Sequence, residues 1–529
     1  MAKILLKGDI ITMDPDKPKA SSMLIEDGVI KEVSDKEINA GDAEVIDAEG
    51  YVMPGLIEPH GHPVEEATSF SKVIIDVHPF VVDSGAESLK LIKEGIANAK
   101  PGEPIVANGV DQGMQPDLPD FTMTDLDEMA PDNPLILIHN SGHLVFFNSK
   151  AAKLAGVNDD TPDPTGSYWG KENGKLNGKG YETACLYTII APVLKMYQPR
   201  AVEFFQNFMQ KMHAVGITTC ANLTGGVNAD ALIGGLLQAN LLTLRIRSYQ
   251  ITTENTASAI PADPKGMHRQ SGVKVWADGS PWVGTADVSF PYLDVPTTKR
   301  LGLEPGQVGH SNYSYDELLK VVETHAKEGY QMAVHAHGDN AIDTTLDVYE
   351  KVIKDQGLKD HRFRMEHCGA MTPEQFKRAK ELDVAVSLFV ANIYYVGHLL
   401  LEIFGPKYGG EWVNVGSAEK AGVSITYHND GVTPANPFRN MQTAIDRTSM
   451  KGTVSEAGIP ATLETGLKAH TIEAAYQLKS EHEIGSLTEG KYGDFIIIDK
   501  DPHEVEVSEL SKIKVKKTYL AGKKVYEAK

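Results

Sequence analysis

The chain has 529 residues, which is enough for one large domain with a smaller one beside it and for a sizeable core. Its 51 Lys and Arg residues face 72 Asp and Glu residues, so the formal net charge is -21. Because no basic stripe offsets this charge, we expect neither nucleic acid nor an anionic membrane surface as a partner, and we expect a small-molecule substrate.

The cysteines and the chain start bear on the compartment. Cys185, Cys220 and Cys368 are odd in number and widely spaced, which argues against a disulfide framework and against a cysteine-type zinc site. The apolar run at the start is too short for a signal peptide, and the longest apolar region, 384–404, is interrupted by polar residues. We therefore expect a cytoplasmic protein.

The two ends of the chain have the same β-rich texture. Residues 1–53 alternate short apolar runs with turn signals, including Asp27-Gly28, which is typical of a hairpin. Residues 485–529 repeat this pattern around the apolar run 494–499. Neither end has much core of its own, and chain termini often lie close together. We predict that residues 1–53 and 485–529 form one discontinuous β-sandwich domain.

The central residues, 54–484, alternate apolar strand-like runs with amphipathic helical runs. We predict helices over 315–328, 341–355 and 372–381, and strands over 106–109, 135–139, 244–247, 273–276, 332–335, 363–367, 384–388 and 423–427. This alternation is typical of a parallel sheet, and a repeat of this length is best closed as a (β/α)8 TIM barrel. In such a barrel, polar residues at the carboxyl ends of strands indicate chemistry.

A possible metal site begins at the first of these strands. The apolar run after Pro54-Gly55 predicts a buried strand, and His60 and His62 at its end project to the same side. A chance His-x-His is unsurprising among 18 histidines. The metal interpretation gains from four more ligand-type residues within or just after apolar runs: Lys274, His335, His367 and Asp430. Together the six could surround one barrel mouth.

The same motifs carry a family resemblance. The chain resembles the amidohydrolase superfamily, and its pattern is similar to the amidohydrolase-3, YtcJ-like branch. The match runs from Gly8–Met13 through Pro54–Ile57 and the two histidines to Gly485–Asp494. Branch-level features are Thr161–Gly166, Lys274 with Ala277–Ser280, and His335–Asp339.

Three positions depart from the family pattern. Glu58 stands where Asp is usual before the histidine pair, and Asn340 stands where Arg is common. The usual Ser-Asp of strand eight is Asn429-Asp430, and His428 precedes it. None of these changes removes a ligand, but Asn340 and His428 could alter substrate contacts.

The resemblance implies a metal-ligand set. His60, His62 and Asp430 would hold one divalent ion, and His335 and His367 a second. Lys274 would bridge the two if its amine is carboxylated, because a cationic lysine cannot ligate. The alternative is an ammonium at Lys274 and a centre with one ion. Imidazole and carboxylate ligands without thiolate suit Zn²⁺, with manganese, cobalt and iron as alternatives.

This ligand set predicts hydrolysis by metal-activated hydroxide. A bound divalent ion lowers the pKa of water from about 15.7 towards about 7. Asp430 would be the catalytic residue that takes the proton from the nucleophile and passes it to the leaving group, unless it serves only as a ligand. The resemblance implies an enzyme that cleaves a non-peptide C–N bond, in an amide, N-formyl or carbamate-like group of a small substrate that can be aromatic. The alternatives are an ester or lactone hydrolase, an isomerase, and a catalytically silent barrel used for binding.

The substrate pocket is the least constrained part of the sequence. His143 resembles a pocket histidine of the branch, and its alternative role is in a capping loop. Trp169, Trp282 and Tyr394 fall in predicted loops and could line an apolar pocket, although aromatic residues are more often core. His337, two residues past His335, is expected to support the ligands rather than to bind the ion. A homodimer is the default expectation for the assembly.

Overall fold

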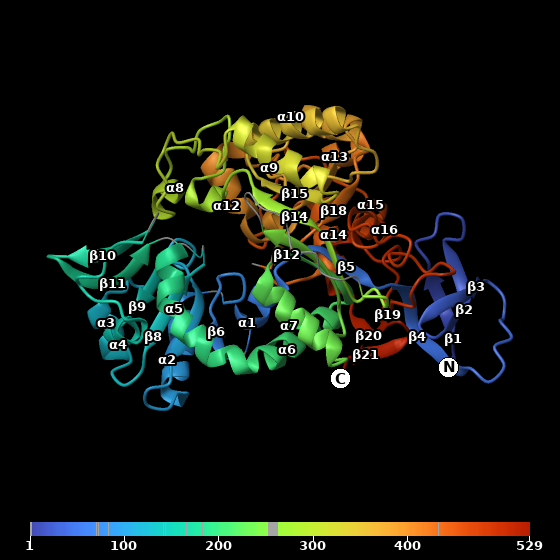
Figure 1. Ribbon diagram of the computed structural model, residues 1–529, viewed down its shortest axis with the longest axis horizontal. Helices are drawn as coiled ribbons and strands as arrows, with labels where there is room; N and C mark the ends of the chain where they lie inside the picture. The colour runs from blue at the N-terminus through green and yellow to red at the C-terminus, as the bar shows by residue number, and fades with distance from the viewer. Residues whose placement is uncertain are drawn as a thin grey trace. The chain divides into compact units, whose positions relative to one another are not determined.

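A computed structural model describes residues 3–69, 71, 73–82, 84–140, 142, 144–164, 167–181, 183–251, 263–431 and 433–529 of the chain (Figure 1). These residues form two compact units. The larger unit comprises Met1–Val64 and Met209–Lys529, and the smaller comprises Glu65–Phe208.

Both chain ends contribute to one seven-stranded sheet of the larger unit. In spatial order its strands are β21 (Lys523–Glu527), β20 (Val515–Leu520), β19 (Phe495–Ile498), β4 (Glu44–Pro54), β1 (Lys3–Ile11), β2 (Lys19–Glu26) and β3 (Val29–Ser34). Figure 1 shows the blue N-terminal strands continuing into the red C-terminal ones. The join is the antiparallel pair β19–β4. The prediction that both chain ends form one β domain is confirmed, but its strands form a single sheet and not the two sheets of the predicted sandwich.

The second sheet of this unit is the nearly closed parallel barrel. Its strands are β5 (Leu56–Gly61), β12 (Ile217–Gly225), β13 (Arg245–Ile251), β14 (His268–Trp276), β15 (Gln331–Ala336), β16 (Arg364–His367), β17 (Ala385–Leu388) and β18 (Ile425–Tyr427). The TIM-barrel prediction is confirmed. The strand β12 was not predicted from the sequence. Its Thr218, Thr219 and Asn222 are typical of an exposed segment, but all three are buried.

Helices cover the barrel between the strands. They are α7 (Val227–Gln238), α8 (Pro296–Arg300), α9 (Tyr315–Lys327), α10 (Asp339–Gln356), α11 (Pro373–Glu381), α12 (Ala391–Tyr408), α13 (Val415–Ala421), α14 (Pro437–Asp446), α15 (Leu463–Ala469) and α16 (Ile472–Gln477). The three predicted helices are α9, α10 and α11. Within the described part of the chain, none of the helices has the length and apolarity needed to cross a bilayer.

The smaller unit is inserted between the first two barrel strands. Its six-stranded sheet has the order β10 (Tyr168–Glu172), β11 (Lys175–Tyr181), β9 (Leu144–Phe147), β8 (Leu135–His139), β7 (Ile105–Val110) and β6 (Ile74–Asp76). Its helices are α1 (Pro63–Ser69), α2 (Gly85–Asn98), α3 (Met123–Met129), α4 (Ser149–Ala155) and α5 (Thr183–Tyr197), and α6 (Ala201–Ala214) leads back to the barrel. The predicted strands 106–109 and 135–139 exist, but they belong to this sheet and not to the barrel. Periodicity alone cannot assign a parallel strand to one sheet or another.

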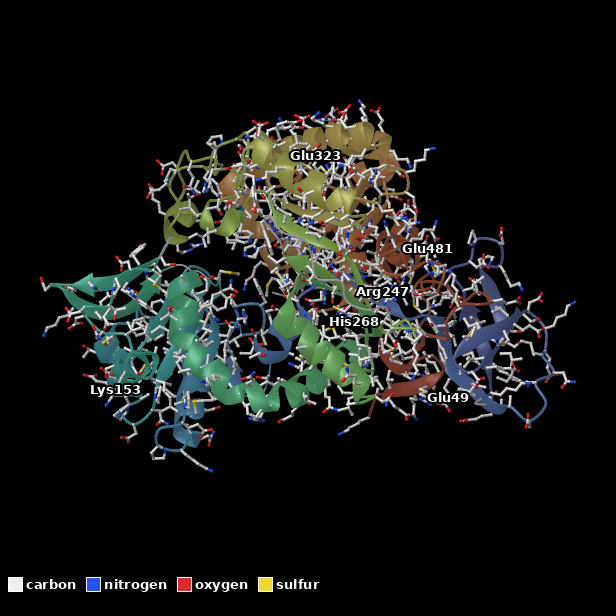
Figure 2. All side chains as sticks on the ribbon, viewed as in Figure 1. Glu49, Lys153, Arg247, His268, Glu323 and Glu481 are labelled. Atoms are coloured by element: carbon white, nitrogen blue, oxygen red, sulfur yellow. The ribbon has the colours of Figure 1, made fainter. Side chains whose placement is uncertain are left out.

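A buried ion pair links the barrel to the terminal sheet inside the larger unit. Arg245 begins β13, and its Nε and Nη2 donate to the two carboxylate oxygens of Asp494 at 2.6 and 3.0 Å. Asp494 directly precedes β19 and also accepts from the backbone N–H of Ala521 at 2.7 Å. Arg247, labelled in Figure 2, lies two residues further along β13, and its Nε donates to Ser480 Oγ at 2.8 Å. The two sheets are therefore fixed to each other by charged side chains.

Asp494→Asn should lower the free energy of unfolding by about 3–5 kcal/mol, since it leaves the buried guanidinium of Arg245 without its counter-charge. Urea unfolding of the purified protein measures the change. The matched control is Asp355→Asn, which removes an exposed pair with Lys351 and should cost no more than about 1 kcal/mol. Equal losses in the two variants would contradict the structural role of the Arg245–Asp494 pair.

Candidate metal centre

The six predicted ligands all lie at the carboxyl ends of barrel strands. His60 lies near the end of β5 and His62 just past it, Lys274 lies near the end of β14, and His335 lies near the end of β15. His367 ends β16, and Asp430 follows β18 by three residues. Because parallel strands end at the same rim of a barrel, residues up to 370 positions apart converge at one mouth.

Asp430 faces the two histidines of the first strand. Its Oδ1 is 3.0 Å from His60 Nε2 and 3.1 Å from His62 Nε2. His62 uses its other nitrogen, Nδ1, to contact Thr224 Oγ1 at 3.1 Å. The Asp430 backbone is left-handed, with φ of 60°, which is uncommon for a residue other than glycine. Two imidazole nitrogens and one carboxylate oxygen therefore converge as the resemblance implied.

Lys274 lies against this group. Its Nζ is 3.4 Å from His60 Nε2 and 4.8 Å from the centre of the Trp276 ring, and the side chain is fully buried. Burial lowers the pKa of the Lys274 amine to about 8, although the carboxylates of Glu366 and Asp430 act in the opposite direction. The lowered pKa favours the neutral amine, which is the form that reacts with CO2.

His335 and His367 lie beside this group, and His367 Nδ1 is 3.9 Å from Asp430 Oδ2. Their ring centres are 4.3 Å apart, and His335 Nε2 is 2.9 Å from the carbonyl oxygen of Gly279. That contact fixes the Nε2 proton and leaves Nδ1 of His335 as the lone-pair nitrogen. His367, like Asp430, has a left-handed backbone, with φ of 73°. Left-handed backbone at a residue other than glycine costs free energy and often occurs at functional sites, and two of the residues with this backbone, His367 and Asp430, are predicted ligands.

His428 is a functional candidate that the sequence analysis noted only as a departure. Its Nε2 is 3.1 Å from His367 Nδ1, and its Nδ1 is 2.9 Å from Ser387 Oγ. The ring stacks on His60, with centres 4.6 Å apart and planes 22° apart. His428 therefore contacts one residue of each predicted ligand pair, His60 and His367.

Glu366 was missed by the sequence analysis. Its Oε2 accepts a hydrogen bond from His60 Nδ1 at 2.6 Å and from Arg364 Nη2 at 3.0 Å, and all three side chains are buried. Burial by itself would raise the pKa of Glu366, but the charge of Arg364 and the hydrogen bond from His60 bring it well below its usual range. The ionised carboxylate holds the proton of His60 on Nδ1, so that Nε2 presents a lone pair to an ion. The sequence signal for this role of Glu366 is a charged residue within the short buried strand β16, directly before the predicted ligand His367.

Glu366→Gln should weaken divalent-ion binding by about 10–100-fold, because the amide holds the His60 ring less firmly and adds no negative charge. Competition with a metallochromic chelator measures the affinity. Glu374→Gln, on the exposed first turn of α11, is the control and should leave it unchanged. An unaltered affinity in Glu366→Gln would show that the carboxylate does not orient a ligand.

Asp278 organises the loop after β14. It is fully buried and accepts hydrogen bonds from the backbone N–H groups of His337 at 2.9 Å and Gly338 at 2.8 Å. Its Oδ1 is 3.6 Å from His335 Nε2. Burial raises the pKa of Asp278 to about 7 despite these hydrogen bonds. The Asp278 carboxyl thereby links the loop after β14 to the residues that directly follow β15, among them His337.

Two of the three family departures contact each other. The carboxylate of Glu58 accepts from the backbone N–H of Asn429 at 3.3 Å and from Asn429 Nδ2 at 2.7 Å. This contact joins the first barrel strand to the residues after the last one. The third departure, Asn340, donates from Nδ2 to Asp287 Oδ1 at 3.1 Å. The residues at two of the departures are therefore hydrogen-bonded to each other.

The donor set fits a divalent ion. Three groups each bring ligand-type atoms within 4.8 Å of one another: His60, His62 and Asp430; His60, His367 and His428; and His335, His337 and His367. Neutral imidazole nitrogens together with a carboxylate oxygen, without thiolate, suit zinc and neighbouring transition metals. The side chains at the barrel mouth therefore provide ligands that suit a divalent transition-metal ion.

The predicted substrate-pocket residues have separate positions. Trp282 lies in the 3-10 turn Pro281–Val283 and packs against the barrel core. Tyr394 lies on α12, not in a loop, and its ring carries Arg439 at 4.3 Å. Trp169 lies on β10, also not in a loop, and is buried in the core of the inserted unit. His143 falls outside the described residues. Their contact with substrate stays a prediction.

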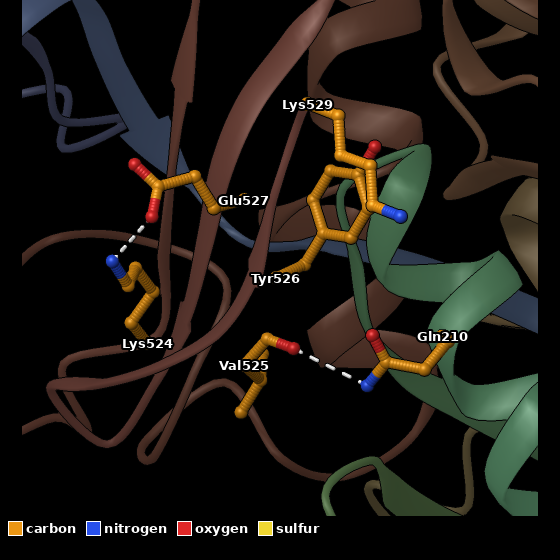
Figure 3. Close-up of a pocket in the computed structure, with 6 residues that line it drawn as sticks. All are labelled: Gln210, Lys524, Val525, Tyr526, Glu527 and Lys529. Carbon is orange, nitrogen blue, oxygen red and sulfur yellow. Dashed lines mark hydrogen bonds and ion pairs between the residues drawn. The ribbon is translucent and has the colours of Figure 1, made fainter.

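A separate surface hollow lies at the terminal sheet. Figure 3 shows it lined by Gln210, Lys524, Val525, Tyr526, Glu527 and Lys529. The Gln210 amide donates to the carbonyl oxygen of Val525 at 3.2 Å. The hollow contains none of the predicted ligands, so it is distinct from the metal centre.

Comparisons with known proteins agree with this geometry. A model of the amidohydrolase family matches residues 44–526. An N-substituted formamide deformylase of Arthrobacter pascens is 26% identical, covering 99% of this chain and 98% of that protein. A Bacillus subtilis (strain 168) protein, provisionally described as amidohydrolase YtcJ, is 24% identical, covering 98% of both. An uncharacterised metal-dependent hydrolase of Pyrococcus horikoshii has the same fold, with a TM-score of 0.75, 22% identity, and coverage of 96% of this chain and 99% of that one.

Proposed function

Because the chain belongs to the amidohydrolase family, we propose that this metal-dependent hydrolase cleaves the C–N bond of a small amide, N-formyl or carbamate-like substrate. The observation that carries the proposal is the convergence of His60, His62 and Asp430 on one point of the barrel mouth. The N-substituted formamide deformylase among its relatives supports the N-formyl class as the first to test.

The bound ion would polarise the scissile carbonyl and activate the attacking water. His60, His62 and Asp430 would hold one ion, and His335 and His367 would hold a second through neutral imidazole nitrogens. Lys274, once carboxylated, would supply a further oxygen ligand. Asp430 accepts the proton of the attacking water and delivers it to the leaving nitrogen. Nitrogen is a poor leaving group until it is protonated, so this transfer is the step for which Asp430 matters most.

Zinc is the proposed metal, because all the side chains around the site donate nitrogen or oxygen and none donates sulfur. The carbamate on Lys274 is supported by the burial of its amine and by its 3.4 Å distance from His60. A cytoplasmic location and a homodimer stay predictions from the sequence.

A matched substrate panel tests the reaction class. The zinc-loaded protein should hydrolyse N-formyl amines or simple amides faster than the esters of the same acyl groups, and solvent ¹⁸O should enter the product acid. Faster turnover of the esters would favour the alternative function of an esterase or lactonase on the same centre. A product without solvent oxygen would indicate an isomerase and contradict hydrolysis.

A further inference from the structure

One nitrogen of the site lacks a hydrogen-bond partner. His337 is 4% exposed, and among the described residues no group pairs with its Nδ1. An unpaired nitrogen alone is ordinary for a neutral histidine, since His325, His398 and His470 each have one as well. The surroundings of His337 are what distinguish it from these three.

His337 shares its surroundings with two predicted ligands. Ligand-type nitrogens of His335, His337 and His367 lie within 4.8 Å of one another. His335 and His337 are two residues apart, the same spacing as His60 and His62 on the first barrel strand. In the described part of the chain, His325, His398 and His470 belong to no such group. Three histidine imidazoles are a known protein ligand set for a catalytic zinc ion. Here one of the three, His337, has a nitrogen without a hydrogen-bond partner among the described residues.

The His337 ring is held in place by a stack of near-parallel rings. Trp412 lies 6.0 Å from His337 with planes 22° apart, and His367 lies 4.7 Å away on a plane 14° apart. Phe404 extends the stack beyond Trp412 at 5.3 Å. Trp412 fits only because residue 369 is glycine, whose added Cβ would lie 2.4 Å from the indole ring. Asp278 also accepts a hydrogen bond from the backbone N–H of His337.

We propose that His337 is a metal ligand, completing with His335 and His367 a three-histidine position for the second ion. This position requires no modification of Lys274, so the second ion would bind whether or not that amine is carboxylated. The inference rests on the proposed function in one respect only, that the barrel mouth binds divalent ions.

The test is the metal binding of His337→Phe. Phenylalanine can keep the stack between Trp412 and His367 but offers no nitrogen. Ions per chain are measured by elemental analysis, and affinity by competition with a chelator, on wild type and variant loaded with zinc. We expect the variant to lose one ion or to bind it more than about 100-fold more weakly, which exceeds the effect of removing a residue that only supports a ligand. With cobalt in place of zinc, the visible absorption spectrum should also change.

A fall in affinity of 100-fold or less, with an unchanged cobalt spectrum, would overturn the proposal. His470→Phe is the matched control, because it removes another buried histidine with an unpaired nitrogen and should leave metal binding unchanged. His337→Leu serves as the second variant if the phenylalanine disturbs folding, and the melting temperature of the metal-free proteins checks the fold. If the wild-type protein takes up no ion, the proposed function is refuted as well. If wild type and His337→Phe bind the same number of ions with the same affinity, only the role of His337 is refuted.

Discussion

Asp430→Asn is expected to lower kcat by roughly 10²–10⁴-fold, the range for removal of a general acid–base group. The asparagine side chain has the same size and can still contact His60 and His62, but it cannot take up a proton from water. The proton needed by the leaving nitrogen must then come from solvent. Steady-state kinetics with the best substrate of the panel measure the loss.

Two controls separate this effect from a loss of metal or of structure. The metal content of Asp430→Asn is determined in the same preparation, so that kcat is compared at equal loading. Asp355→Asn changes an exposed carboxylate on α10 and should retain full activity. An Asp430→Asn protein that keeps its metal and more than half of the wild-type kcat would assign proton transfer to another group.

Removal of divalent ions should abolish hydrolysis and also lower thermal stability. A ligand that binds only the folded state at about 100 times its Kd stabilises it by about 2.7 kcal/mol. Removal of the ions therefore forfeits this stabilisation of the folded state. Dialysis against a chelator, followed by activity assays and thermal unfolding, measures both effects.

Chelator saturated with calcium beforehand is the control, and addition of zinc should restore activity and melting temperature together. A metal-free protein that retains full activity would contradict a metal-dependent reaction. Recovery of stability without activity would indicate that the ion is structural and that the chemistry lies elsewhere.

The barrel and the residues at its mouth could be predicted because they leave strong local signals. A strand with both faces buried is a short apolar run, as at 332–335 and 384–388, and the ligand-type residues interrupt or follow such runs. The His-x-His pair and the residues His335, His367 and Asp430 therefore stand out against apolar neighbours. The convergence of these residues in space then follows from barrel geometry.

Other features depend on contacts that no local pattern contains. The strand β12 is rich in threonine and is buried only because the barrel closes around it. The runs 106–109 and 135–139 have the same pattern as barrel strands, yet they pair in the inserted unit. The roles of Glu366 and His337 depend on partners 306 and 30 residues away, namely His60 and His367. Sequence spacing cannot reveal such pairs.

The central claim is that the barrel mouth binds catalytic divalent ions. The most direct test is the number of ions per chain in the purified protein, determined by elemental analysis, with the intact mass recorded on the same sample. The account predicts two ions per chain and the added mass of one CO2 on Lys274. A folded protein that contains no ion and takes none up from zinc-containing buffer would contradict it.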